Sequence, residues 1–390
     1  MNVSDSGVGV DDSKVEVKNL PAGLQYNSAN QTITGSIATA SKTEIKVFAR
    51  DKKGNKTVKT VSLVAVQPKP IYAIKDSTIP NVATASKFVE VPTGVTNPSV
   101  AWKDGKPSTA TAGETHKIVT VSANGYTSTE VEVPVTVYPK VTLRKVNNTE
   151  VTEYHEIVGQ PLTSSVSGTR VRTTEATADF YVEFEGGNEP NGTTVVFKNG
   201  TPTSTTAGTS SQTIVVTYPN GAGTVEKTVT FKTYGNEVNY PVGKDYFETE
   251  VGSKFEKKDA GDYVKPSSDL ANPTGTAIAW HDGRRQDNPV DKPQATIGIR
   301  EENINIWYTT PIARLRGDDT FNYTHQDLKV HLAVKPQAPT LTANQFQGKA
   351  GTKPEITVSN LPTTAQLTTG STVKVQLKDA DGNVVAEKTV

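Results

Sequence analysis

An aromatic residue followed by an Asp-Gly or Asn-Gly turn and a later glycine recurs in this sequence, and it constrains the fold more than any other feature. The copies span Trp102–Gly113 and Phe197–Gly208, and the two glycines of each copy are equally spaced, because 113 − 105 = 8 and 208 − 200 = 8. A third copy begins at Trp280-His281-Asp282-Gly283. Since these dipeptides favour tight hairpin turns, the recurrence predicts repeated β-domains, with the aromatic residue of each copy in a core.

Size, charge and cysteine content exclude several classes of protein. At 390 residues the chain exceeds one compact domain, so several domains are expected. It has 41 basic and 41 acidic residues, and zero net charge provides no overall field to attract nucleic acid or an anionic membrane. Because cysteine is absent, disulfides and thiolate chemistry are excluded. Packing must stabilise the domains, unless Lys–Asn isopeptide cross-links, which the sequence does not reveal, contribute.

The two ends of the sequence predict an excerpt of a longer protein. Met1-Asn2-Val3 is followed by polar residues instead of a signal peptide, and the last residues, Glu387–Val390, resemble an interrupted strand. No apolar run approaches the roughly 18 residues of a membrane helix. We therefore expect no membrane insertion of this segment.

Strict alternation of apolar and polar residues predicts strands along most of the chain. Val131, Val133, Val135 and Val137 alternate with polar residues and proline, and Leu328–Val334 repeats this pattern. Ile45 and Val47 alternate in the same way, and Val61 and Leu63 resume the pattern after the turn at 51–55. Helical patterns are limited to a turn or two, for example within 245–265. The predicted class is all-β, a tandem array of small β-sandwich domains in an elongated rod.

Proline-rich stretches mark three of the four boundaries between five predicted domains. They are Val66–Pro70, Tyr138–Lys140 and Val334–Pro339, and their prolines favour an extended backbone that limits swing between neighbours. The predicted domains are residues 1–67, truncated at the N-terminus, then 68–139, 140–235, 236–335 with insertions, and 336–390, truncated at the C-terminus.

Two sets of motifs resemble known families. Asn19–Leu24 and Ile33–Gly35 resemble the signature of bacterial immunoglobulin-like (Ig-like) domains of the cadherin-like type. Thr213–Gly221, with Gly200-Thr201-Pro202 and Ala207-Gly208 before it, resembles Rib-type repeats of Gram-positive cell-wall-anchored surface proteins, with Asn220 where that family usually has aspartate.

These resemblances imply the type of each domain and its setting. Residues 1–67 and 336–390 would be Ig-like, 68–139 and 140–235 Rib-like, and 236–335 a divergent Rib-like unit. The whole resembles the large matrix-binding surface proteins of staphylococci. This implies an extracellular segment at the bacterial cell surface, attached to the cell wall through regions outside it.

The chain begins and ends with related hairpins. Lys374–Asn383 aligns with Lys46–Asn55, and lysine, valine, aspartate, glycine and asparagine agree between them. Asp379, Asp381 and Asn383 are also spaced like calcium ligands. Lys53 stands where Asp381 does, and it would repel a metal, so we favour a plain turn and expect no metal or cofactor.

Candidate ligand-binding residues gather in 236–335. Trp307 and Tyr308 are adjacent in a predicted strand, so one should face the core and the other solvent, where it could stack on a sugar or a partner. A basic patch for a sulfated glycan could form from Arg284, Arg285, Arg314 and Arg316. Residues 236–334 hold 12 basic and 16 acidic residues, and 12 − 16 = −4 favours a solvated surface instead.

The sequence predicts a non-catalytic protein. The five histidines are scattered, and no nucleophile elbow or phosphate-binding loop is present. The first hypothesis is a stalk or adhesion segment that projects a distal domain or contributes to binding of host matrix. Alternatives are an adhesin module centred on 236–335 that binds fibronectin or a glycan, and accessory domains of a secreted polysaccharide-active enzyme.

Overall fold

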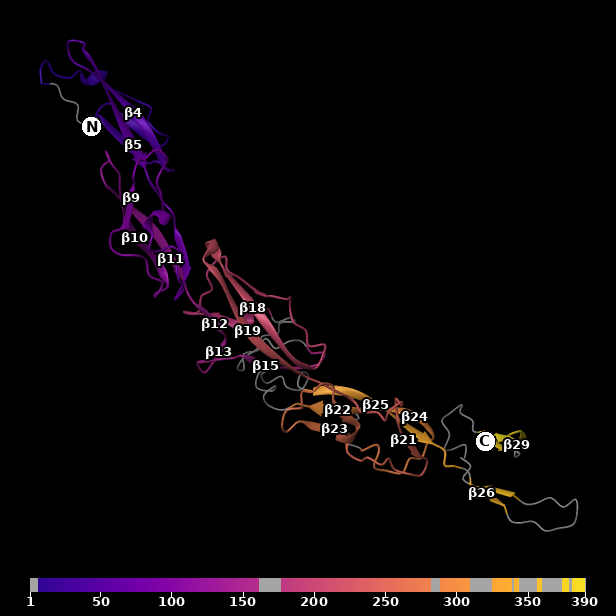
Figure 1. Ribbon diagram of the computed structural model, residues 1–390. Coiled ribbons are helices and arrows are strands. Elements are labelled where there is room, and N and C mark those ends of the chain that lie inside the picture. The colour runs from indigo at the N-terminus through magenta and orange to yellow at the C-terminus, as the bar shows by residue number, and fades with distance from the viewer. Residues whose placement is uncertain are drawn as a thin grey trace, which may run out of the picture. The chain divides into compact units, whose positions relative to one another are not determined.

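The computed structural model describes residues 6–160, 177–281, 288–308, 325–338, 340–343, 356–359, 374–378 and 381–389. Its described elements are strands joined by turns and short 3-10 helices, so the predicted all-β class is confirmed (Figure 1). The chain divides into two compact units. Unit one comprises Met1–Thr142, Val182–Val195 and Val215–Glu226, and unit two comprises Leu143–Tyr181, Val196–Ile214 and Lys227–Val390.

Unit one begins with an N-terminal domain built on one long hairpin. Its sheet has the order β1-β4-β5, with β4 and β5 antiparallel (Figure 1). Strands β2 and β3 form a separate hairpin. Ile45 and Val47 are buried, as their alternation predicts, whereas Val61 on the edge strand is 42% exposed. The elements are η1 (Asp12–Lys14), β1 (Glu16–Lys18), β2 (Leu24–Asn27), β3 (Thr32–Gly35), β4 (Ser41–Arg50) and β5 (Lys56–Ala65).

The glycines of the Ig-like signature have a steric reason. Gly23 (φ 88°) and Gly35 (φ 115°) lie close together at the open end of the β2–β3 hairpin, where Gly35 lies opposite Leu24. A Cβ at residue 35 would lie 2.0 Å from the carbonyl oxygen of Gly23, and a Cβ at residue 23 would lie 2.1 Å from that of Ser36. Backbone atoms cannot make way, so both positions require glycine.

Three successive repeats follow, defined here as residues 67–138, 141–234 and 236–335. The first contains β6 (Gln67–Pro68), β7 (Ile71–Ile74), η2 (Ala85–Phe88), β8 (Val89–Glu90), β9 (Ser99–Trp102), β10 (Gly113–Ser122) and β11 (Thr129–Tyr138). The second contains β12 (Val141–Leu143), β13 (Lys145–Val146), β14 (Thr149–Glu150), β15 (Glu153–Ile157), η3 (Ala178–Tyr181), β16 (Val182–Phe184), β17 (Thr194–Phe197), β18 (Gly208–Tyr218), η4 (Pro219–Gly221) and β19 (Gly223–Tyr234). The third contains β20 (Asn236–Val238), β21 (Phe247–Glu250), η5 (Ala260–Tyr263), β22 (Val264–Pro266), β23 (Ala277–His281), β24 (Gly298–Trp307) and β25 (His325–Lys335).

The same four-stranded sheet is built in each repeat. The strand orders are β7-β11-β10-β9, β15-β19-β18-β17 and β21-β25-β24-β23. In all three sheets the strand that comes first in the chain, β7, β15 or β21, pairs parallel with the last strand of the repeat. Opposite the sheet, a 3-10 helix leads into a short strand that pairs with the first residues of the repeat, in the pairs β6-β8, β12-β16 and β20-β22. The repeats therefore share one topology.

The aromatic residue of each repeated phrase lies in or against a core, as predicted. Phe197 is 7% and Trp280 is 5% exposed, and Trp102 packs against the core of the first repeat. Trp102 lies opposite Val119, and Trp280 lies opposite Ile304. Strand β10 begins at Gly113 and β24 begins at Gly298, so each partner comes six residues after the first glycine of its strand (119 − 113 = 6 and 304 − 298 = 6). The third copy of the phrase is therefore genuine, and Gly298 is its closing glycine.

The structure departs from the sequence prediction at the first proline linker, Val66–Pro70. Gln67–Pro68 is a strand that pairs with β8, so this stretch is partly built into the following repeat. The valines Val131 to Val137 of β11 are buried, and the short helix expected within 245–265 is η5. The C-terminal segment has two hairpins: β26 (Thr340–Ala343) with β27 (Ile356–Ser359), and β28 (Lys374–Lys378) with β29 (Val384–Thr389).

Candidate functional site

The predicted ligand-binding residues do not gather into one described surface. Tyr308 is 3% exposed and belongs to the core of the third repeat. Trp307 is half-buried, and its ring lies 4.6 Å from that of His325 at an interplanar angle of 30°. Of this pair, Tyr308 thus faces the core, and only Trp307 keeps the predicted ligand role. The arginines of the predicted basic patch lie outside the described residues; they are Arg284, Arg285, Arg314 and Arg316.

Polar atoms accompany Trp307 on its face of the sheet. Trp307 lies opposite His325 and Asn305 lies opposite Asp327, so these four alternate residues project to the same side. The Oδ1 atom of Asn305 and the Nδ1 atom of His325 are buried and have no hydrogen-bond partner among the described residues. Unpaired buried polar atoms are costly and call for an explanation, such as a ligand that supplies the missing bonds.

A more regular site lies at the ends of the repeats, where two tyrosine pairs recur. Tyr138, the last residue of β11, packs on Tyr218, with ring centroids 5.9 Å apart and an interplanar angle of 33°. Tyr234, the last residue of β19, packs on Tyr308 at 6.2 Å and 36°. Tyr218 and Tyr308 hold the same place in their repeats, since 218 − 208 = 10 and 308 − 298 = 10. Each pair therefore joins the last strand of one repeat to the next repeat.

Hydrogen bonds fix these pairs. The hydroxyl of Tyr218 donates to the carbonyl oxygen of Pro139 at 2.8 Å, and Asn220 Nδ2 donates to the hydroxyl of Tyr138 at 2.9 Å. Asn236 Nδ2 donates to the hydroxyl of Tyr308 at 2.7 Å. Burial raises the pKa of Tyr218 to about 12 and that of Tyr308 to about 12, so both rings stay neutral at ordinary pH.

The junction between the second and third repeats is also apolar. Ile157, at the end of β15, is 0% exposed, and Tyr234, at the end of β19, is 5% exposed. Both belong to a core cluster whose other members come from the third repeat. Gly235, next to Tyr234, is tightly packed, because a Cβ there would lie 2.9 Å from Ser267 Oγ, 3.1 Å from Val158 and 3.2 Å from Ala207. The third repeat thus completes its core with residues of its predecessor.

A loop clasp recurs inside each repeat. The loop before the long strand β10, β18 or β24 accepts a backbone hydrogen bond from the turn after the first sheet strand. The bonds are Asp76 N to Thr109 O at 3.0 Å, Gly159 N to Ser204 O at 2.9 Å and Gly252 N to Gln294 O at 2.8 Å. In every case the acceptor precedes the opening glycine by four residues, because 113 − 109, 208 − 204 and 298 − 294 all equal 4. Sequence reasoning missed this clasp, although that spacing was available.

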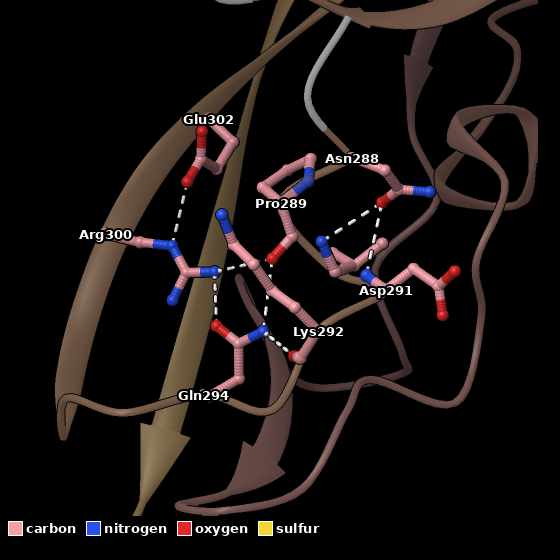
Figure 2. Close-up of polar contacts among 8 residues, drawn as sticks. Asn288, Pro289, Asp291, Lys292, Gln294, Arg300 and Glu302 are labelled. Carbon is pink, nitrogen blue, oxygen red and sulfur yellow. Dashed lines mark hydrogen bonds and ion pairs between the residues drawn. The ribbon is translucent and has the colours of Figure 1, made fainter.

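In the third repeat a buried polar network elaborates the clasp (Figure 2). Arg300 points from β24 into the loop, where Nη2 donates to Gln294 Oε1 at 2.6 Å and to the carbonyl oxygen of Pro289 at 3.2 Å, while Nε donates to Glu302 at 2.8 Å (Figure 2). The amide of Gln294 donates to Pro289 and Lys292. Gln294 is 5% exposed, so these bonds satisfy a buried amide and connect residues 289–294 of the loop to β24.

The ionisable groups of β15 form a structural cluster. His155 Nδ1 lies 3.0 Å from the hydroxyl of Tyr234, its Nε2 lies 3.1 Å from Glu153, and Lys232 pairs with Glu153 at 2.8 Å. Burial lowers the pKa of His155, and this outweighs the opposite influence of Glu153. Within the described ranges, no three His, Cys, Asp or Glu residues are placed to hold a metal ion.

Comparisons with known proteins give one family match, which covers the N-terminal domain. Residues 2–66 match the family model described as "Putative Ig domain", which confirms the Ig-like prediction for this segment. No curated protein matches the chain. In the part of the chain that the structure describes, no helix has the length and apolar character needed to span a membrane.

Similar solved structures include an enzyme, a protocadherin and a cell adhesion molecule. The endo-fucoidan hydrolase MfFcnA4 of glycoside hydrolase family 107 is 15% identical with a TM-score of 0.16, over 58% of this chain and 39% of the hydrolase. Cadherin domains 1–5 of protocadherin gamma B2 are 10% identical with a TM-score of 0.15, over 89% and 78%. The eight N-terminal Ig domains of Down syndrome cell adhesion molecule are 11% identical with a TM-score of 0.25, over 83% and 44%. These scores are too low to support an argument about function.

Proposed function

We propose that this chain is a non-catalytic spacer segment of an extracellular bacterial surface protein, which carries an adhesive domain away from the cell wall. The observation that carries the proposal is the repeated junction, in which the last residue of one repeat packs on an equivalent tyrosine of the next. A buried junction restricts rotation between neighbours more than a free linker does. The cell-wall setting and the Rib-type relationship remain predictions from the sequence motifs.

Small-angle scattering of the chain tests the spacer role. A compact chain of 390 residues would have a radius of gyration of about 21 Å. The radius of gyration of a stiff row of domains should exceed this compact value by clearly more than the experimental error. It should still be smaller than that of an unfolded chain of the same length. Replacing Tyr138 and Tyr234 with alanine should broaden the distribution of dimensions at unchanged strand content. A radius near the compact value, or identical scattering from the junction variant, would contradict the proposal.

A second candidate function is ligand binding by the third repeat. It is favoured by the contact between the rings of Trp307 and His325, beside the Oδ1 atom of Asn305, which has no hydrogen-bond partner among the described residues. A fibronectin and glycan binding screen should then give a signal with the whole chain that Trp307→Ala removes. Trp102→Ala is the control, because Trp102 Nε1 already donates to the carbonyl oxygen of Val82 at 2.8 Å. Equal binding by both variants would remove this candidate.

A further inference from the structure

The N-terminal domain carries a concentrated positive charge that the neutral total of the chain conceals. Residues 46–56 contain five basic residues and one acid, so 5 − 1 = +4. They form the end of the β4–β5 hairpin (Figure 1), where all five basic side chains are exposed. These basic residues are Lys46, Arg50, Lys52, Lys53 and Lys56.

The register of the sheet places like charges directly opposite each other on its outer face. Lys18 of β1 faces Lys46 of β4, and Arg50 of β4 faces Lys56 of β5. Directly opposed like charges destabilise a sheet. A nearby acid, Glu16, lies 3.6 Å from Lys18, but no described acid pairs with Arg50 or Lys56. The arrangement therefore opposes folding, and a ligand that supplies negative charge would relieve it.

An apolar strip separates the two opposed pairs. Phe48 lies opposite Val58, which is 48% exposed. The ammonium groups of Lys18 and Lys56 stand over the Phe48 ring, at 5.3 and 4.9 Å from its centroid. Lys46 and Arg50 are four residues apart on β4, which puts their Cα atoms about 14 Å apart along the strand. Cations thus flank the Phe48–Val58 strip on both sides, and on β1 the residue opposite Phe48 is the acid Glu16.

The single acid of the hairpin end is committed to the turn. Asp51 Oδ1 accepts hydrogen bonds from the backbone nitrogens of Lys53 at 2.9 Å and Asn55 at 2.8 Å, and Oδ2 accepts one from Asn55 Nδ2 at 2.7 Å. The bonds from Asn55 favour the carboxylate and lower the pKa of Asp51. These turn bonds are sufficient to explain why Asp51 is present, so Asp51 is not counted as part of the basic face.

The related hairpin near the C-terminus shows that the turn does not need the basic residues. An offset of 328 residues aligns the two hairpins. The last residue of β28 matches the last residue of β4 (378 − 50 = 328), and the first residue of β29 matches the first residue of β5 (384 − 56 = 328). Gly382 has φ 87° and its counterpart Gly54 has φ 89°. In that hairpin, residues 374–384 contain two basic residues and two acids, so 2 − 2 = 0. Its counterparts of Phe48, Lys52, Lys53 and Lys56 are Gln376, Ala380, Asp381 and Val384.

We propose that the outer face of the β4–β5 hairpin, centred on Phe48, binds a linear anionic polysaccharide. Its carboxylate or sulfate groups would pair with Lys46, Arg50 and Lys56, and the apolar face of a sugar ring would lie on Val58, beside Phe48. A nucleic acid fits less well, because the face offers one half-buried ring instead of a row of stacking platforms. This site goes beyond the spacer role, which requires no ligand, so its failure would leave that role intact.

Retention of the complete chain on immobilised polymers tests the proposal. Heparin supplies sulfate, polygalacturonate supplies carboxylate, and dextran is the neutral control. We expect salt-dependent retention on at least one acidic polysaccharide and none on dextran, and the two acidic columns distinguish sulfate from carboxylate. Double-stranded DNA is the competitor. Retention that DNA displaces as readily as free polysaccharide does would overturn the assignment to a polysaccharide.

Two variants with a matched control locate the site. The double variant Lys46→Glu/Arg50→Glu should lower affinity by more than about tenfold, because two cations become anions. Lys87→Glu/Lys106→Glu changes net charge equally at exposed positions of the first repeat and should retain binding. The first variant also turns both opposed pairs into attractive ones, so its thermal midpoint should not fall.

A second variant guards against a folding defect. Lys52→Ala/Lys53→Asp/Lys56→Val installs residues that the related hairpin already carries around the same turn, and it should also weaken retention. The proposal is overturned if both variants bind like the control, or if affinity falls only in variants whose thermal midpoint falls with it.

Discussion

Replacing Ile157 with alanine tests whether one repeat completes the core of the next. Ile157 belongs to β15 of the second repeat, yet it is 0% exposed within the core cluster of the third. The change deletes three carbons, worth about 0.8 kcal/mol each, so the transfer contribution is about 2.4 kcal/mol. The cavity left behind raises the expected cost toward roughly 4 kcal/mol. Although residue 157 precedes the third repeat, that repeat should lose stability.

The distribution of tryptophans provides the assay. The chain has 3 tryptophans, and in a Trp102→Phe background the two that remain, Trp280 and Trp307, both lie in the third repeat. Their fluorescence during urea unfolding therefore reports on that repeat alone. With a slope of about 2 kcal/mol per molar urea, a loss of about 2.4 kcal/mol lowers the midpoint by about 1.2 M.

Val119→Ala is the matched control, because Val119 is 0% exposed in the core of the first repeat. It should destabilise the first repeat and leave the fluorescence midpoint of the third unchanged. If Ile157→Ala shifts the midpoint no more than Val119→Ala does, the repeats fold independently and the inference of a shared core is refuted.

Three further predictions concern a glycine, a loop and alkaline pH. Gly35→Ala should unfold or severely destabilise the N-terminal domain, since its Cβ would meet a carbonyl oxygen at 2.0 Å; near-wild-type thermal unfolding would contradict this. Arg300→Ala should leave the buried oxygen of Gln294 unpaired, cost about 1–3 kcal/mol and speed proteolysis in the loop 288–294, whereas unchanged cleavage would count against the network. Burial raises the pKa of Tyr218 and that of Tyr308 to about 12 in the folded protein, against about 10 in the unfolded chain, so their stabilising effect is complete below about pH 10 and is lost as the pH rises toward 12. For each tyrosine, this difference in pKa corresponds to roughly 2–3 kcal/mol in the free energy of unfolding. If the wild-type chain and the two Tyr→Phe variants unfold at the same alkaline pH, this prediction is refuted.

Local patterns in the sequence were sufficient to predict the strands and the cores. Alternation in β11 matches its buried valines, and the Asp-Gly and Asn-Gly phrases mark equivalent turns because side-chain period and turn geometry are short-range properties. The third repeat was predicted less well. Its insertion moved Gly298 fifteen residues from Gly283, so the eight-residue spacing that identified the other copies was lost.

Contacts between distant residues could not be predicted in the same way. Tyr138 and Tyr218 are eighty residues apart, and only the repeated topology brings the end of one closing strand to the next repeat. For a similar reason, the sequence predicted a linker at Pro68 where the structure has a strand. That strand pairs with β8, about twenty residues further along the chain, and local sequence does not reveal such a partner. Among the predicted site residues, adjacency in a strand correctly separated Trp307 from Tyr308, but it could not tell which one faces the core.

The parallel pairing of first and last strands has a mechanical consequence. In the first repeat, Ile71 lies opposite Val135 and Ile74 lies opposite Tyr138, so the chain enters at one end of this strand pair and leaves at the other. Tension along the polypeptide would slide the two strands past each other and strain all their hydrogen bonds together. Strands that peel apart break their bonds one after another under a smaller force. Because β15 and β21 pair in the same sense with β19 and β25, all three repeats would resist stretching in this way.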